Sequence, residues 1–299
     1  MCIVVAKYFK EFGWTVIKNR DQDYVPDVNF VDEKHKAVGE VLVMYDKTTG
    51  YKEGMNHDGM GIITTSLTPL ISLETNNKDG KLIDNALGMK DPKKAASYLE
   101  KNKLTGYIFI FNEDKLFLIE AARKEDGKGK YESTMREVPK DEVIVRTNHG
   151  VDFPWAGFQS GLSERQDIWC KSSKMRMEQG EKVAAKAKNP FEILAGLASK
   201  MNDDLQMNVF RVALKDRQMR TIFQTLYVPS QKKMYLVPIQ CRMTLDTDRE
   251  FIHTEVLDNS HIKKIFGRKL KHFAKIEKHG DVVKCVEESF IPSFKQFIS

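Results

Sequence analysis

Short apolar runs, separated by residues that favour turns, dominate much of the chain. These runs are rich in β-branched and aromatic residues, as strands usually are. They cover residues 2–8, 13–18, 38–45, 60–67, 106–111, 116–121, 143–146, 220–227 and 234–239. Because each run is short and continuously apolar, we expect strands that are buried on both faces, as in stacked sheets.

Three segments have a helical pattern instead. Residues 77–104 are rich in Lys, Asp and Ala, with Pro92 placed to open a helix. Residues 172–203 contain Pro190 in an equivalent position. In residues 258–299 apolar side chains recur at roughly helical spacing among lysines, which predicts a basic and largely helical C-terminal segment. Strand clusters separated by helix pairs indicate an α+β fold with helices outside the sheets.

Length and composition predict a large globular domain. The chain has 299 residues, 41% of them hydrophobic, without an internal repeat or low-complexity linker, so we expect a single domain over residues 2–299. It lacks a run of eighteen apolar residues, and Lys7 and Lys10 interrupt the first apolar stretch. We therefore expect neither a membrane span nor an export signal. Four widely spaced cysteines argue against a zinc site or disulfide framework and fit a cytoplasmic location.

The formal net charge of +6 changes this picture little. It comes mostly from lysines, and the basic C-terminal segment is expected to hold its lysines in water while its apolar face packs on the body. An anionic partner for this segment is the alternative. Since the sequence contains no nucleic-acid-binding motif, we expect no nucleic acid partner.

The cysteine at position 2 offers the clearest chemistry. Aminopeptidases remove Met1 efficiently before a small residue, which would leave Cys2 with a thiol and a free α-amine. The amine titrates at about 7.7–8.0 and a thiol at about 8.5, so the amine can accept the thiol proton. A nucleophile beside its own base is the minimal arrangement for acyl transfer. The alternative is that Cys2 is a small buried hydrophobe of the first strand.

Six further features follow Cys2 in an order known from one group of enzymes. They are Asn19-Arg20-Asp21, Asn56-His57-Asp58-Gly59-Met60-Gly61, Ile119-Glu120-Ala121, Arg146-Thr147-Asn148-His149, Ser172-Ser173-Lys174-Met175-Arg176 (as a helix start) and the hairpin from Thr221 to Pro238. Together they resemble the N-terminal-nucleophile (Ntn) hydrolases of the choloylglycine hydrolase clan, which cleave linear amides. The likeness covers about residues 2–240 and is best to the acyl-coenzyme A:6-aminopenicillanic acid acyltransferase-like branch.

The resemblance implies a fold and an activity. The fold would be a four-layer αββα sandwich of two stacked, mainly antiparallel sheets, with the nucleophile at the start of the first strand. The activity would be hydrolysis of a linear, non-peptide amide in a small N-acylated amine through an acyl-enzyme on Cys2. Acyl transfer from the same acyl-enzyme to another amine is the alternative. The resemblance further implies a homo-oligomer, either a dimer or a tetramer, and no cofactor.

Roles for individual residues also follow from the resemblance. Cys2 would attack the carbonyl, and Asp21 would orient its α-amine. Arg20 would lie beside the thiolate and depress the pKa of the thiol. Asn148 would donate a side-chain N–H to the oxyanion, and Arg220 would complete the polar network.

One position departs from the bile-salt-hydrolase pattern. Where those enzymes have an asparagine at the oxyanion hole, this chain has Ser66, next to Thr65. A backbone N–H at this position could still serve the oxyanion, while contacts with substrate would differ. No metal site is expected, because the seven histidines never fall at metal-ligand spacing with carboxylates.

Bland interpretations of the same residues stay open. In most proteins an Arg-Asp pair such as Arg20-Asp21 is a turn or a surface ion pair of little energetic value, and Asn148-His149-Gly150 has the composition of a turn that ends a strand. The rival for the whole chain is a non-catalytic binding or assembly protein that has the Ntn fold and keeps Met1.

Overall fold

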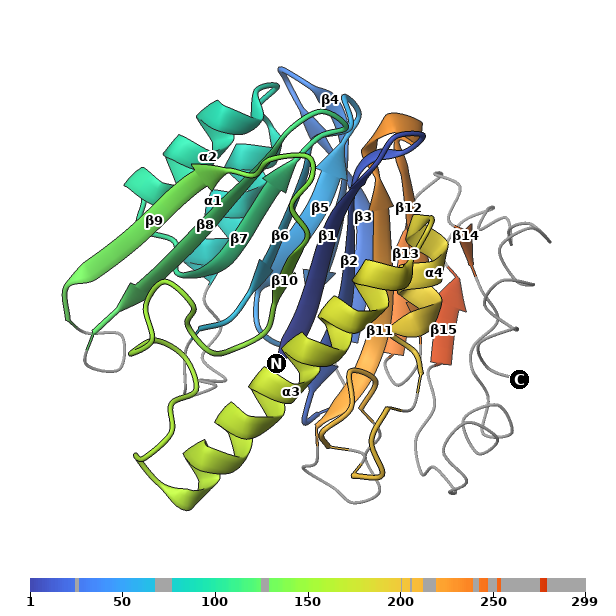
Figure 1. The fold of residues 1–299 in the computed structure, drawn as a ribbon. Helices are drawn as coiled ribbons and strands as arrows, with labels where there is room; N and C mark the ends of the chain where they lie inside the picture. The colour runs from blue at the N-terminus through green and yellow to red at the C-terminus, as the bar shows by residue number, and fades with distance from the viewer. Residues whose placement is uncertain are drawn as a thin grey trace.

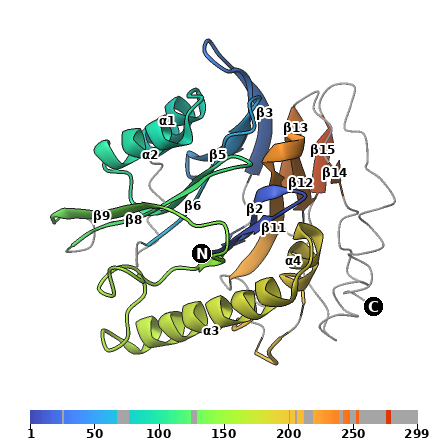
Figure 2. The same ribbon diagram turned by 45° about the horizontal axis from the view of Figure 1, so that its top comes forward.

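Two stacked β-sheets with helices on both outer faces make up the structure (Figures 1 and 2). It is a computed structural model that describes residues 1–24, 27–67, 77–124, 129–199, 201–204, 206–211, 219–238, 242–246, 252–253 and 275–278. None of the helices in these ranges is both long enough and apolar enough to cross a membrane.

The first sheet has six strands within these ranges, and the N-terminal strand is the second from one edge. In spatial order they are β10 (Ile144–Arg146), β1 (Cys2–Phe9), β2 (Gly13–Gln22), β11 (Arg220–Val228), β12 (Lys233–Pro238) and β14 (Ile252–His253). All neighbours are antiparallel except β12 and β14. The register places Cys2 opposite Arg20 and Asp21 opposite Thr221.

The second sheet has nine strands in the described part of the chain. In spatial order they are β15 (Lys275–Lys278), β13 (Arg242–Asp246), β3 (Asp27–His35), β4 (Gly39–Asp46), β5 (Tyr51–Asn56), β6 (Gly61–Thr65), β7 (Gly106–Phe111), β8 (Leu116–Arg123) and β9 (Tyr131–Glu137). The run from β3 to β9 is antiparallel throughout, and β13 pairs in parallel with both of its neighbours.

The helices form the two outer layers. Helices α1 (Asn77–Leu87) and α2 (Pro92–Lys101) cover the nine-stranded sheet, and α3 (Glu164–Lys186) and α4 (Pro190–Gly196) cover the other, as Figure 2 shows. A short 3₁₀ turn, η1 (Pro229–Gln231), joins β11 to β12. Pro92 and Pro190 each open a helix, as expected from the sequence.

Alternation along the strands explains the layers. In β1, Ile3 and Val5 pack against α3 and α4, whereas Val4 and Ala6 face the other sheet. Because successive side chains of a strand point to opposite faces, continuously apolar strands bury both faces. The nine-stranded sheet does the same, with Val43 toward α1 and α2 and Met44 toward β1 and β2. The predicted α+β, αββα architecture is confirmed.

A glycine lets α3 lie close to the first sheet. A Cβ atom on Gly180 would come within 2.7 Å of Ile3 Cδ1 and 2.9 Å of Val145 Cγ1, which is closer than side chains pack. Helix α3 carries several polar side chains near the start of β1, where Cys2 lies. The close approach of the helix therefore helps to set the distance between these side chains and Cys2.

Several sequence-based expectations need correction. Strands β3, β5 and β9 were not expected, because polar residues interrupt their apolar pattern. Helix α3 begins at Glu164, capped by Ser163, so Ser172 lies inside it and not at a helix start. Lys275–Lys278 is a strand, so the helix prediction is wrong there; the rest of the C-terminal segment at 258–299 lies outside the described residues.

A buried ion pair connects the two sheets. Lys18 of β2 and Glu53 of β5 are fully buried and in direct contact. Lys18 Nζ also donates to Tyr51 Oη at 2.8 Å and to the Thr64 carbonyl at 2.9 Å. Burial opposes the charge on Lys18, but Glu53 together with Tyr51 and Cys2 outweighs burial and raises the pKa of the lysine. The pair therefore keeps its charges inside the core between the sheets.

Removing one member of this pair should destabilise the fold strongly. Glu53→Gln leaves the Lys18 charge buried without its counter-ion, which typically costs about 3–5 kcal/mol of unfolding free energy. Urea unfolding of Glu53→Gln, Lys18→Met and the double variant should show a double variant less destabilised than the sum of the single ones. The matched control is Glu142→Gln at the half-exposed Arg136–Glu142 pair, which should cost no more than about 1 kcal/mol. Equal losses for Glu53→Gln and Glu142→Gln would contradict the expectation.

Candidate functional site

Cys2 lies at the start of β1, with Met1 continuing the strand before it. The Met1 ammonium donates to the Asp21 carbonyl at 2.8 Å, and the Asp21 amide donates to the Met1 carbonyl at 2.7 Å. Met1 and Cys2 are both buried, at 7% and 6% exposure. Burial lowers the pKa of the Met1 amine. Strand alternation directs the Cys2 side chain into the space between the sheets and the Met1 side chain toward α3.

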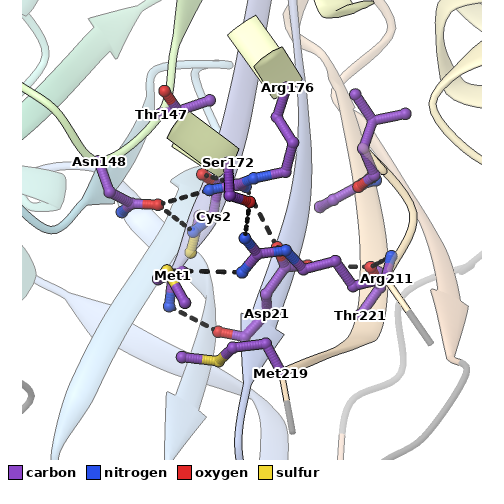
Figure 3. Close-up of polar contacts among 12 residues, drawn as sticks. Met1, Cys2, Asp21, Thr147, Asn148, Ser172, Arg176, Arg211, Met219 and Thr221 are labelled. Carbon is purple, nitrogen blue, oxygen red and sulfur yellow. Dashed lines mark hydrogen bonds and ion pairs between the residues drawn. The ribbon is translucent and has the colours of Figure 1, made fainter. Parts of the chain in front are cut away.

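Asn148 is the side chain that contacts the Cys2 nitrogen (Figure 3). Its Oδ1 accepts from the Cys2 nitrogen at 3.1 Å and from Arg176 Nη2 at 3.1 Å. A peptide N–H and a guanidinium can only donate, so these contacts fix the orientation of the amide. Its Nδ2 donates to the Ser66 carbonyl at 2.9 Å and to Thr65 Oγ1 at 3.1 Å. Since Nδ2 has two protein acceptors here, its role as an oxyanion donor stays a prediction.

Helix α3 holds the loop that carries Asn148. Ser173 Oγ accepts from the Asn148 amide at 2.9 Å, and Thr147 Oγ1 donates to the Ser173 carbonyl at 2.9 Å. His149 Nδ1 lies 2.9 Å from Ser173 Oγ, and Tyr107 Oη donates to the His149 carbonyl at 2.8 Å. Burial lowers the pKa of His149 to about 4, so the ring is neutral at neutral pH and serves to fix the loop.

Asp21 is the anionic centre of the site. Its Oδ1 accepts from Thr221 Oγ1 at 2.9 Å, and its Oδ2 accepts from Arg176 Nη1 at 3.3 Å. Arg211 Nε lies 3.8 Å from the same Oδ2. Arg176 Nη1 also donates to the Cys2 carbonyl at 3.2 Å. The carboxylate thus anchors two arginines and does not itself contact the Cys2 nitrogen through any hydrogen bond found among the described residues.

Two further cations surround Cys2 from the side of the inter-sheet core. Arg20 lies opposite Cys2 in the register, donates from Nη2 to Asp46 Oδ2 at 2.7 Å, and stacks on the Tyr51 ring at 4.2 Å. Burial opposes its charge, but Asp46 together with the neighbouring Tyr51, Cys2 and Tyr24 outweighs burial and raises the pKa of Arg20. Both Arg20 and Lys18 interact electrostatically with Cys2.

The structure brings most of the predicted site together. Cys2 and Asn148 are in direct contact, Asp21 joins them through Arg176, and Thr65 and Ser66 contact Asn148. Arg20 is a buried strand residue and not a surface turn. Arg220 opens β11 opposite Gln22 and is buried.

Arg176 and Arg211, to which the sequence analysis assigned no role, are the guanidinium groups that contact the Asp21 network. Arg176 belongs to a stretch that the resemblance singled out, so it could have been proposed as a site residue. Arg211 lies in no recognised stretch, and no sequence signal pointed to it. Its place beside Asp21 follows from the tertiary structure alone.

A second polar cluster was also missed by the sequence analysis. Glu33, His35 and Asp84 bring their ligand atoms within 4.8 Å of one another. The Lys52 ammonium lies 2.7 Å from Glu33 Oε1 and 3.1 Å from Asp84 Oδ2. A lysine therefore already pairs with both carboxylates of this cluster, and we assign it no metal.

Comparisons with solved structures find distant likenesses. The chain is similar to the penicillin V acylase from Agrobacterium tumefaciens, with 12% identity, 79% of this chain and 86% of that chain covered, and a TM-score of 0.41. It is also similar to a mutant of the conjugated bile acid hydrolase from Clostridium perfringens, with 13% identity, coverage of 80% and 89%, and a TM-score of 0.47. With TM-scores below 0.5, these likenesses add no weight to an assignment. No curated protein matches the chain.

A family model gives the decisive match. The model of the acyl-coenzyme A:6-aminopenicillanic acid acyl-transferases matches residues 15–240, which is well over half of the chain and reaches from β2 to β12. This range contains Asp21, Asn148, Arg176 and Arg211, which surround the start of β1. The chain therefore belongs to the acyl-coenzyme A:6-aminopenicillanic acid acyl-transferase family.

Proposed function

We propose that this protein, once Met1 is removed, is an acylase with Cys2 as its nucleophile. It would hydrolyse the linear amide of a small N-acylated amine. The observation that carries the proposal is the 3.1 Å contact between the Cys2 nitrogen and Asn148 Oδ1. This contact would hold the nitrogen in place when it becomes the α-amine that serves as base.

The surroundings of Cys2 support this role. Asn148 Oδ1 would accept a hydrogen bond from the free amine and so direct the lone pair of the amine toward the thiol. Arg176, which donates to the Cys2 carbonyl, adds positive charge to that of Arg20 and Lys18. All three cations interact electrostatically with Cys2, the residue that would attack the carbonyl.

The proposed reaction has two stages. The α-amine takes the thiol proton as sulfur attacks the carbonyl carbon, and an oxyanion forms. The C–N bond then breaks as the ammonium gives its proton to the leaving amine, which leaves a thioester on Cys2. Water attacks the thioester with the amine again as base, which releases the acid and the thiol. Donors for the oxyanion would come from Asn148 Nδ2 and the Thr65–Ser66 segment that it contacts.

Two alternatives follow from specific observations. The family match favours acyl transfer, in which an amine and not water takes the acyl group from Cys2. The packing of Met1 favours a binding protein without chemistry, because the main chain of Met1 is hydrogen-bonded to Asp21 and its side chain is buried beside Phe158, Cys170 and Met219. A retained Met1 would leave the Cys2 nitrogen as a peptide amide, which cannot act as a base.

Intact-mass measurement tests the nucleophile. The purified protein should lack the mass of Met1 and should gain an acyl adduct transiently when mixed with a chromogenic N-acyl amide. Cys2→Ala should lose the adduct, because no thiol remains to form the thioester. Retention of Met1, with no adduct from any acyl donor, would contradict the enzyme and favour the binding protein.

Substitution of Asn148 tests the second residue. Asn148→Ala removes the acceptor for the Cys2 amine and the Nδ2 donor, and loss of one such catalytic contact typically lowers kcat by about 10²–10³. Asn102→Ala, at the exposed end of α2, is the matched control and should keep its activity. Near-normal kcat for a folded Asn148→Ala protein would remove Asn148 from the mechanism.

A further inference from the structure

Among the described residues, positive charge exceeds negative charge at the start of β1. Lys18 and Arg20 each have a carboxylate of their own, Glu53 and Asp46. Arg176 and Arg211 instead share the carboxylate of Asp21. Asp204 is exposed and interacts with Arg211 by longer-range electrostatic attraction. Buried charges are normally balanced by partners, so this imbalance needs a reason.

Of the buried cations Lys18, Arg20, Arg176 and Arg211, Arg211 has the weakest partners in the described part of the chain. Its Nη1 donates to the sulfur of Met1 at 3.4 Å, and its Nη2 contacts Ser172 Oγ (Figure 3). A thioether is a weak acceptor, whereas a guanidinium presents five donors that match a carboxylate. Burial and the neighbouring Arg176 lower the pKa of Arg211 to about 9, which still leaves it charged at neutral pH. Its Nη1 is therefore aimed into the space that the Met1 side chain fills.

The other walls of this space are apolar. Met1 packs in a cluster with Phe158, Cys170 and Met219, and Trp169 packs against the cluster. Phe158 and Trp169 are in ring contact, with centroids 5.1 Å apart. We call the space filled by the Met1 side chain, between these residues and Arg211, the Met1 pocket. It combines apolar walls with one buried cation, which suits a ligand with an apolar body and an anionic group.

The position of the Met1 pocket relates it to one half of the substrate. Met1 is joined to the Cys2 nitrogen, the atom that would pass a proton to the leaving amine. That amine must therefore lie within hydrogen-bond distance of the Cys2 nitrogen, the atom to which Met1 is attached, so the Met1 pocket adjoins the place of the leaving amine. This step rests on the proposed function.

We propose that removal of Met1 turns the Met1 pocket into the binding site for the amine half of the substrate, with Arg211 binding a carboxylate on that half. The amine with these features is an α-amino acid with an apolar side chain. The substrate class is then the N-acyl derivatives of apolar amino acids. Asp21 would remain as the partner of Arg176, while the carboxylate of the ligand balances Arg211.

Binding to an inactive protein tests this inference separately from the chemistry. Cys2→Ala protein that begins at residue 2, released from a cleavable fusion and verified by intact mass, is titrated calorimetrically with N-hexanoyl-leucine and with N-hexanoyl-leucinamide. The acid should bind about tenfold to a hundredfold more tightly than the amide, because charge-assisted hydrogen bonds to Arg211 need the carboxylate.

Variants of Arg211 identify the group that recognises the carboxylate. Arg211→Met in the same background should abolish the preference for the acid while leaving affinity for the amide unchanged. Arg211→Lys keeps the charge without the planar fork and should keep part of the preference, which provides a second reading should Arg211→Met fold poorly. Arg136→Met, at a surface pair with Glu142, is the matched control and should bind as the parent does.

The outcomes separate this inference from the proposed function. Equal affinity for acid and amide in the parent protein, or a preference that survives Arg211→Met, would overturn the carboxylate site even if wild type forms an acyl-enzyme. A preference that depends on Arg211 would support the site, even if wild type never forms an acyl-enzyme and the proposed hydrolysis fails.

Discussion

The pairing of buried charges on β2 is the constraint on which the rest of the structure depends. Lys18, Arg20 and Asp21 lie on a strand that is covered on both faces. Burying a charge without a partner costs several kcal/mol. The partners come from different layers: Glu53 and Asp46 from the second sheet, and Arg176 from α3. These ion pairs thus fix how the second sheet and α3 are placed against the first sheet.

The same constraint shapes the surroundings of Cys2. Antiparallel pairing with β2 sets Cys2 opposite Arg20, and Arg176, held by Asp21, reaches both the Cys2 carbonyl and Asn148. The charged groups that pair within the core therefore also surround Cys2. The same residues would therefore serve both the stability of the fold and the reactivity of Cys2. Asn102 and Arg136 lie outside this network, so substitutions there leave it intact.

The state of the site depends on whether Met1 is retained or removed. Its main chain extends β1 by one residue, and its side chain fills a space between α3 and the start of β11. A retained Met1 makes the Cys2 nitrogen an amide and fills the Met1 pocket. Its removal would create the base and open the pocket in one step. Cleavage of a single peptide bond would thereby separate an inert chain from an active one.

The sequence alone was enough to predict the layers of the fold and several residues of the candidate site. Continuous apolar runs predicted the strands buried on both faces, and the ordered motifs along the chain pointed to Cys2, Asp21 and Asn148. Tertiary structure alone decided the position of Arg211, the orientation of the Asn148 amide and the strands β3, β5 and β9. The reason is physical: Arg211 and Met1 are 210 positions apart and Asn148 and Cys2 are 146 apart, so their contacts have no local pattern. The polar residues of β3, β5 and β9 interrupt the apolar alternation, and these strands form through pairing with neighbouring strands.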